Sequence, residues 1–263
     1  MKKTLYINKE DNINPEKLKK LTYMLKRLNT EELTSDLRDE AIEMVKKISP
    51  LEISLAEQKL IDEGMNPNEL RHLCDIHMEI LKDELKNLEE KISVGHILYT
   101  FIREHDEIMK FLNELEKVNS EIQKMNSYDD EKVEKVLKLS INLLNAEPHH
   151  KREEDVLFPK MESLGITGPT RIMKLEHESL RKKKRELKEI CGVKDYIPFE
   201  EFKNRVDSIS KDLIFELRDH IFKENYILYP TAMESINEKE FKELKVMCDE
   251  MGYCEFTPKE LLI

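Results

Sequence analysis

Two phrases of the sequence repeat the same order of side chains that can bind a metal. One phrase, HHKREEDVLFP, begins at His149, and the other, HIFKENYILYP, begins at His220. In each phrase a glutamate, Glu153 or Glu224, follows four residues later, and a proline follows ten residues later. Residues four apart share one face of an α-helix, with Cβ atoms on the order of 6 Å apart. An imidazole and a carboxylate of each phrase can therefore reach metal ions inside a helical bundle.

Each phrase is preceded by one more histidine in an acidic context. His105 stands in the sequence EHDE, and His177 stands in EHE. His177 follows His105 by 72 residues, and His220 follows His149 by 71 residues. Matched spacing of this kind indicates that a helical hairpin has been duplicated together with its candidate ligands.

The adjacent histidines of the first phrase leave a choice of ligand. His150 is also followed by a glutamate four residues later, Glu154, but its distance to the proline is nine residues. Only His149 keeps the ten-residue distance found in the second phrase, so we prefer His149. Glu154 stays a candidate ligand or bridge beside Glu153, because a carboxylate one residue further along the helix can swing towards a second metal.

The candidate ligands are imidazoles and carboxylates that the helical repeat can direct inwards: His105, His149, Glu153, Glu154, His177, His220 and Glu224. A carboxylate can bridge two ions while each imidazole serves one, so the set predicts a dinuclear site of the kind that four-helix bundles hold. Imidazole and carboxylate ligands suit iron, manganese or zinc. The number of histidines and the symmetry favour two iron ions, since zinc is satisfied by a site for a single ion.

Three other candidate ligands have simpler interpretations. His96 has no counterpart in the second hairpin, so we expect a structural role for it. Cys74 and His77 lie three residues apart and could contact a haem or a metal. A packed cysteine beside a surface histidine is the commoner arrangement. The four cysteines form no C-x-x-C pair, which argues against a disulfide scaffold.

The composition indicates that helices position these residues. Charged residues make up 38% of the chain and hydrophobic residues 39%, with 6 Gly and no Trp, which is typical of long amphipathic helices. We predict an all-α chain with a smaller helical domain over residues 1–91, a four-helix bundle over 92–237, and a short helix and tail over 238–263. Bundle helices are expected near residues 94–119, 130–163, 170–190 and 199–235. N-terminal helices are expected from Pro15, over Leu37–Ile48, over Leu51–Glu63 and from Pro67 to about Lys91.

The charge of the chain argues against nucleic acid or an anionic membrane as partner. The formal net charge is −11, whereas both partners favour a basic surface. The one basic run, Arg181 to Arg185, is predicted to be a solvated helix face. No apolar stretch approaches the roughly 20 residues that span a bilayer, and the start, MKKTLYINKEDN, lacks the apolar core of a signal peptide. We therefore expect a cytoplasmic protein.

One histidine, an H-x3-E pair, another histidine and a second H-x3-E pair resemble the hemerythrin-like HHE cation-binding family, over about residues 94–235. The resemblance implies an up-down-up-down bundle around an oxo- or hydroxo-bridged di-iron centre that binds oxygen, nitric oxide or peroxide. It also implies nitrogen ligands and bridging carboxylates, namely His105, His149, His177 and His220 with Glu153 and Glu224. One position departs from the pattern, because oxygen-carrying hemerythrins place a second histidine four residues before the one on the third helix, where this chain has Met173. A more open site is expected, which weakens the case for simple oxygen carriage.

Residues 49–81, SPLEISLAEQKLIDEGMNPNELRHLCDIHMEIL, are similar to a domain of unknown function that often precedes such bundles in anaerobic bacteria and archaea. That similarity implies no established chemistry.

The leading functional hypothesis is a non-haem di-iron protein that senses or scavenges a small diatomic ligand or peroxide in oxidative or nitrosative stress. Whether it is an enzyme stays open, and reduction of a ligand would require a redox protein partner because no flavin or nicotinamide motif is present. Two alternatives are iron storage or donation, including repair of iron–sulfur clusters, and an interaction or signalling module that reports ligand or iron state.

Overall fold

The structure is a computed structural model that describes residues 15–30, 34–45, 48, 52, 55–56, 59–60, 63–65 and 92–262. The regular elements among these residues are all helices, as predicted. The chain divides into two compact units, one of residues 1–91, 157–172 and 222–240 and one of residues 92–156, 173–221 and 241–263. Six of the seven candidate ligands belong to the second unit.

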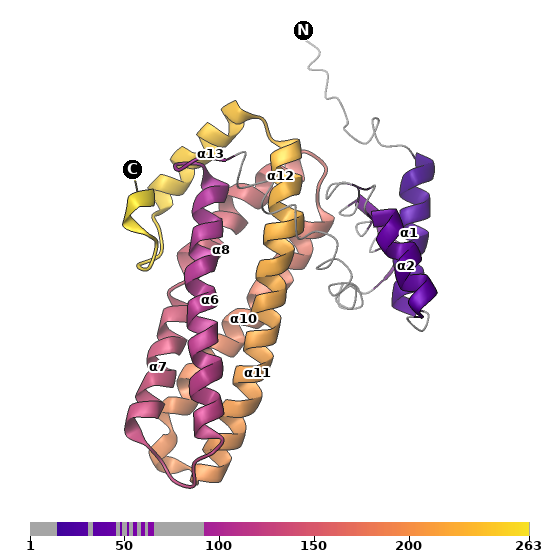
Figure 1. The fold of residues 1–263 in the computed structure, drawn as a ribbon. Coiled ribbons are helices and arrows are strands. Elements are labelled where there is room, and N and C mark those ends of the chain that lie inside the picture. The colour runs from indigo at the N-terminus through magenta and orange to yellow at the C-terminus, as the bar shows by residue number, and fades with distance from the viewer. Residues whose placement is uncertain are drawn as a thin grey trace. The chain divides into compact units, whose positions relative to one another are not determined.

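Two helices form most of the described N-terminal region, α1 (Pro15–Thr30) and α2 (Ser35–Val45) (Figure 1). Met24 of α1 packs with Leu37 and Ala41 of α2. α2 begins two residues before the helix expected over Leu37–Ile48, and residues 46 and 47 of that range lie outside the described residues.

Other predictions for the N-terminal region fall outside the described residues. These are the helix from Pro67 to about Lys91 and the pair of Cys74 and His77 within it. The helix expected over Leu51–Glu63 is described at only a few positions.

Four long helices form the bundle of the second unit, α6 (Ile97–Ile122), α7 (Asp130–Leu144), α10 (Gly168–Gly192) and α11 (Phe199–Lys223). Their apolar faces meet in one core, which includes Leu112, Leu139, Leu187 and Leu213. Consecutive helices join at opposite ends of the bundle, which gives the up-down-up-down order (Figure 1). The amphipathic repeat read from the sequence is thus the cause of the fold, since each helix buries one stripe against the others.

The helix expected over residues 130–163 is interrupted. After α7 the chain starts a new short helix, α8 (Glu147–Arg152), with Pro148 at its second position. A proline is tolerated there because the N–H groups of a first helical turn have no helical partner. α9 (Phe158–Ser163) completes the expected range.

Both of the repeated sequence phrases, which begin at His149 and His220, pass through a turn of π-helix. The first is η3 (Glu153–Leu157), and the second is η5 (Glu224–Leu228), which continues from α11. Pro159 and Pro230 follow these turns and have no N–H for the carbonyl four residues earlier, with which the proline ring also clashes. A wider π turn relieves this conflict, and such turns are frequent at functional sites. The repeated proline therefore accounts for the repeated π turn.

The C-terminal segment adds α12 (Tyr229–Ser235), α13 (Glu238–Met251) and a 3-10 turn, η6 (Lys259–Leu261). Thr257, just before η6, is buried. Among the described helices, none combines the length and apolar character needed to cross a membrane.

Candidate metal centre

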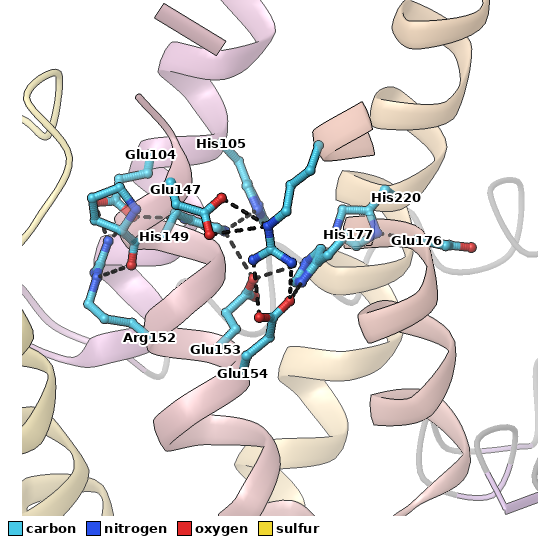
Figure 2. A network of polar contacts seen from close by, with 12 residues as sticks. Glu104, His105, Glu147, His149, Arg152, Glu153, Glu154, Glu176, His177 and His220 are labelled. Atoms are coloured by element: carbon cyan, nitrogen blue, oxygen red, sulfur yellow. Dashed lines mark hydrogen bonds and ion pairs between the residues drawn. The ribbon is translucent and has the colours of Figure 1, made fainter. Parts of the chain in front are cut away.

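Four histidines from four helical segments converge in the bundle. His105 lies on α6, His149 on α8, His177 on α10 and His220 on α11, and each is at most 2% exposed. Their rings lie close together in pairs, with centroids 4.7 Å apart for His105 and His149 and 4.6 Å apart for His177 and His220. Figure 2 shows these histidines with their acidic neighbours.

The first pair of histidines brings two ring nitrogens face to face. Nε2 of His105 lies 3.1 Å from Nε2 of His149. Two such nitrogens can share one proton, or both can direct lone pairs at one cation. Donor atoms on adjacent positions of one ion, each about 2.1 Å from it, lie about 3 Å apart. The observed separation fits this arrangement.

Glu153 lies between the two pairs. Its Oε2 atom is 3.5 Å from Nε2 of His149 and 3.6 Å from Nε2 of His177. One carboxylate oxygen near histidines of both pairs is the placement expected of a bridging ligand.

Three of the histidines are fixed from behind by carboxylates. The Nδ1 atom of His149 bonds to Glu104 at 2.8 Å, that of His177 to Glu154 at 2.7 Å and that of His220 to Glu176 at 2.9 Å (Figure 2). A carboxylate at one ring nitrogen sets the orientation and tautomer of an imidazole and makes its other nitrogen a better metal ligand. The arrangement thus leaves Nε2 of each ring as the nitrogen that can bind a metal.

Glu104 is itself held by a buried network. Arg152 donates from Nη2 to both carboxylate oxygens at 2.6 and 2.7 Å, and the Thr257 hydroxyl donates to Oε1 at 2.6 Å. Burial raises the pKa of the Glu104 carboxyl, but the hydrogen bond to His149 and the charges of His149 and Arg152 outweigh burial and bring the pKa to about 2. Glu104 is therefore ionised, and the C-terminal segment helps to hold it.

Glu154 lies in a second network. Arg181 binds both of its oxygens, at 2.9 and 3.0 Å, and also bonds to Glu147. Burial raises the pKa of Glu154, but the hydrogen bonds from His177 and Arg181 outweigh it and bring the pKa to about 2. Both oxygens are thus engaged away from Nε2 of His177, which places Glu154 behind a histidine instead of at the bridging position considered from the sequence.

The basic run from Arg181 to Arg185 is only in part the solvated face that the sequence predicts, because Lys182 and Arg185 are exposed but other members of the run are not. Arg181 binds the two glutamates just described, and Lys184 is only 2% exposed. Lys184 lies seven residues after His177 on α10, two turns along the same face, so its side chain enters the bundle.

His150 is also buried among the histidines, although the sequence favoured His149. Its ring is stacked on that of His177, with centroids 4.0 Å apart and an angle of 11° between the rings. It meets His220 edge to face, with centroids 6.1 Å apart. Nitrogen atoms of His150, His177 and His220 lie within 4.8 Å of one another, close enough to hold one metal ion. Burial, followed by the nearby positive charges, lowers the pKa of His150 well below 6.5, so its ring is neutral.

Two further residues are placed by their own helices. Glu224 is buried at the first position of η5, four residues after His220 on a continuous helix. His96 caps α6, accepting a hydrogen bond from the backbone N–H of Leu98 at 3.2 Å. The structural role expected for His96 is confirmed.

The donor chemistry fits ions that bind nitrogen and oxygen. Cys191, Cys248 and Cys254 are free, and burial raises the pKa of each thiol to about 12. A protonated thiol is a poor metal ligand. Among the described residues, the groups close enough to hold a metal are buried histidines and glutamates.

Several supporting residues escaped the sequence analysis. Glu104 and Glu176 precede His105 and His177, and they are also 72 residues apart, so the duplication could have revealed them as a pair. Arg152 and Thr257 have no such repeat and come from segments far apart in the sequence.

Comparison with known families agrees with this architecture. A family of unknown function, DUF438, matches residues 21–87, and the hemerythrin HHE cation-binding domain matches residues 96–232. No curated protein matches the chain. The second match covers more than half of the chain and includes the four histidines described above, together with Glu153 and Glu224. The chain belongs to the hemerythrin HHE cation-binding family.

Proposed function

We propose that this chain is a non-haem di-iron protein that binds oxygen, nitric oxide or peroxide, for sensing, scavenging or defence against oxidative and nitrosative stress. The observation that carries the proposal is the set of three buried histidines, each bonded at Nδ1 to a carboxylate at 2.7 to 2.9 Å. Such carboxylates commonly support metal-bound histidines. A bundle core that served packing alone would not need them.

The proposed ligands divide into two groups. His105 and His149 hold one iron, and His177 and His220 hold the other. Glu153 and Glu224 bridge the irons, while Glu154 orients His177 from outside. The iron pair, when bound, supplies the electrons and the coordination position at which a diatomic molecule or peroxide is taken up.

The surroundings of the histidines favour a small ligand. Phe101 packs edge-on against His149, with ring centroids 5.0 Å apart, and Met173 is a buried apolar side chain one turn before His177 on α10. Both side chains are apolar and present no charged group to an organic substrate. The protein is proposed to act in the cytoplasm, with a redox protein as the source of external electrons.

Metal analysis of protein purified without oxygen tests the iron pair. We expect about two irons per chain in the wild type and a clear loss in His105→Ala and Glu153→Ala. His96→Ala is the matched control, because it removes a histidine of the same region that caps α6. If neither ligand variant holds less iron than the control, the proposed centre is wrong.

Spectroscopy of the loaded protein tests ligand binding. Addition of azide, nitric oxide or oxygen should produce a new charge-transfer band in the wild type and not in His105→Ala. Rapid transfer of iron to an apo acceptor, without any such band, would favour the alternative of iron donation.

A further inference from the structure

We infer that His150 is a third nitrogen ligand of the iron held by His177 and His220, so that the two irons have different coordination. This inference rests on the proposed di-iron function. It adds a residue that the repeat of the sequence had set aside in favour of His149.

The position of the His150 ring supports ligation. It stacks on His177 at 4.0 Å and lies edge to face with His220, and nitrogens of the three rings lie within 4.8 Å of one another. Two nitrogens on adjacent positions of one ion, each about 2.1 Å from it, lie about 3 Å apart, so ligation of one iron by both His150 and His177 would turn their rings out of the stack towards the ion. The three rings come from α8, α10 and α11, and one nitrogen of each lies close enough to the others to share an ion.

Burial of a ring nitrogen without a hydrogen-bond partner also points to a ligand. His150 is 2% exposed, and its Nδ1 atom has no hydrogen-bond partner among the described residues. Buried polar atoms are nearly always paired with protein, water or an ion.

Packing alone does not require a histidine here. The equivalent position of the second hairpin, 71 residues later, is Ile221, which is also buried. An aliphatic side chain therefore suits this depth of a hairpin, and the imidazole of the first hairpin is a chemical difference between the two halves.

His150 also compensates for the second histidine that is missing at the position of Met173. The sequence predicted a more open site because His177 is the only candidate histidine on α10. With His150, the end of the site with His177 has three nitrogens, and the end with His105 and His149 has two.

Iron-57 Mössbauer spectroscopy of the full chain tests the assignment. Wild type should take up two irons with two distinct quadrupole doublets. His150→Phe keeps a flat ring against His177 but removes both nitrogens. Loss of even an outer partner of a ligand weakens metal binding about 10- to 100-fold, and loss of a ligand itself should cost at least as much. We therefore expect His150→Phe to weaken one of the two irons at least tenfold, with the doublet of the other iron retained. His96→Phe, the control, should match wild type.

Chemical rescue separates ligation from packing. His150→Gly should lose the same iron as His150→Phe, and added imidazole should restore its doublet. Iron loss that imidazole does not restore would assign His150 a packing role. Two irons in His150→Phe with wild-type affinity and spectrum would also overturn the inference. Absence of iron from wild type would instead overturn the proposed function itself.

Discussion

The two hairpins of the bundle place their ligands alike but support them differently. In each hairpin, the glutamate before the first histidine bonds to Nδ1 of the second histidine, as Glu104 does for His149 and Glu176 for His220. The duplication therefore copied a pair of histidines together with the carboxylate that orients one of them. What repeats is the arrangement of the candidate metal ligands.

The differences between the hairpins concern what lies behind the ligands. In the first hairpin, Arg152 and Thr257 bind Glu104 in the interior. The equivalent of Arg152 in the second hairpin is Lys223, which is half-buried. The first hairpin thus depends on a buried charge network, and its stability should respond more strongly to substitution.

Removal of Arg152 should give the largest effect. Arg152→Met leaves Glu104 as a buried carboxylate without its cation, and breaking one partner of a buried ion pair typically costs about 3–5 kcal/mol. We expect a loss of this size in the free energy of unfolding of the apo protein, measured by urea denaturation. Lys223→Met, at the equivalent but only half-buried position, should cost clearly less than Arg152→Met, because a charge nearer to water needs less compensation. Equal losses would contradict the difference between the hairpins.

Substitution of the orienting glutamates should weaken metal binding in both hairpins. Glu104→Gln and Glu176→Gln keep the size of the side chain but lose the charge, so iron affinity should fall about 10- to 100-fold in each. Competition with a chelator measures this. If only Glu104→Gln weakens iron binding, the matching roles of the two carboxylates are wrong.

Loss of the contact between Glu104 and the C-terminal segment should have a smaller effect on stability. Thr257→Val removes one hydrogen bond to Glu104, which keeps its bonds to Arg152 and His149. A hydrogen bond to a charged group contributes about 1.5–3 kcal/mol, and we expect the lower end of that range in urea denaturation. Thr170→Val removes a bond to the carbonyl of Thr167 and should cost about 1 kcal/mol. A larger loss of stability in Thr170→Val than in Thr257→Val would show that the segment after α13 adds little to the stability of the protein.

The smallest effect is expected at an exposed pair that links the hairpins. Arg218 of α11 bonds to Glu116 of α6 at 2.8 Å, and the glutamate side chain is 60% exposed. Arg218→Ala should lower the free energy of unfolding by about 0.2–1 kcal/mol, with no change in iron content. A change in iron content would mean that coupling between the hairpins extends well beyond the metal residues.

Periodicity in the sequence was enough to predict the helices and to single out His105, His149, His177 and His220, which the bundle buries. Each bundle helix begins within three residues of the expected position, because amphipathic stripes and breaks such as Gly165 and Gly192 act locally. The interruption at Pro148 was missed, although proline marks it. The roles of Arg152, Arg181 and Thr257 depend on contacts across 27 to 153 residues, and no local pattern encodes these.

The π turns after Glu153 and Glu224 bear on the history of the chain. Such a turn contains one residue more than the α-helical turn it replaces, and one residue rotates a helix by about 100°. Both hairpins carry the extra residue at the same place, before the same proline. A single insertion in an ancestral hairpin, followed by duplication, accounts for both turns, whereas the reverse order requires two identical insertions. On this account, the one-residue shift in helical phase is older than the duplication of the hairpin.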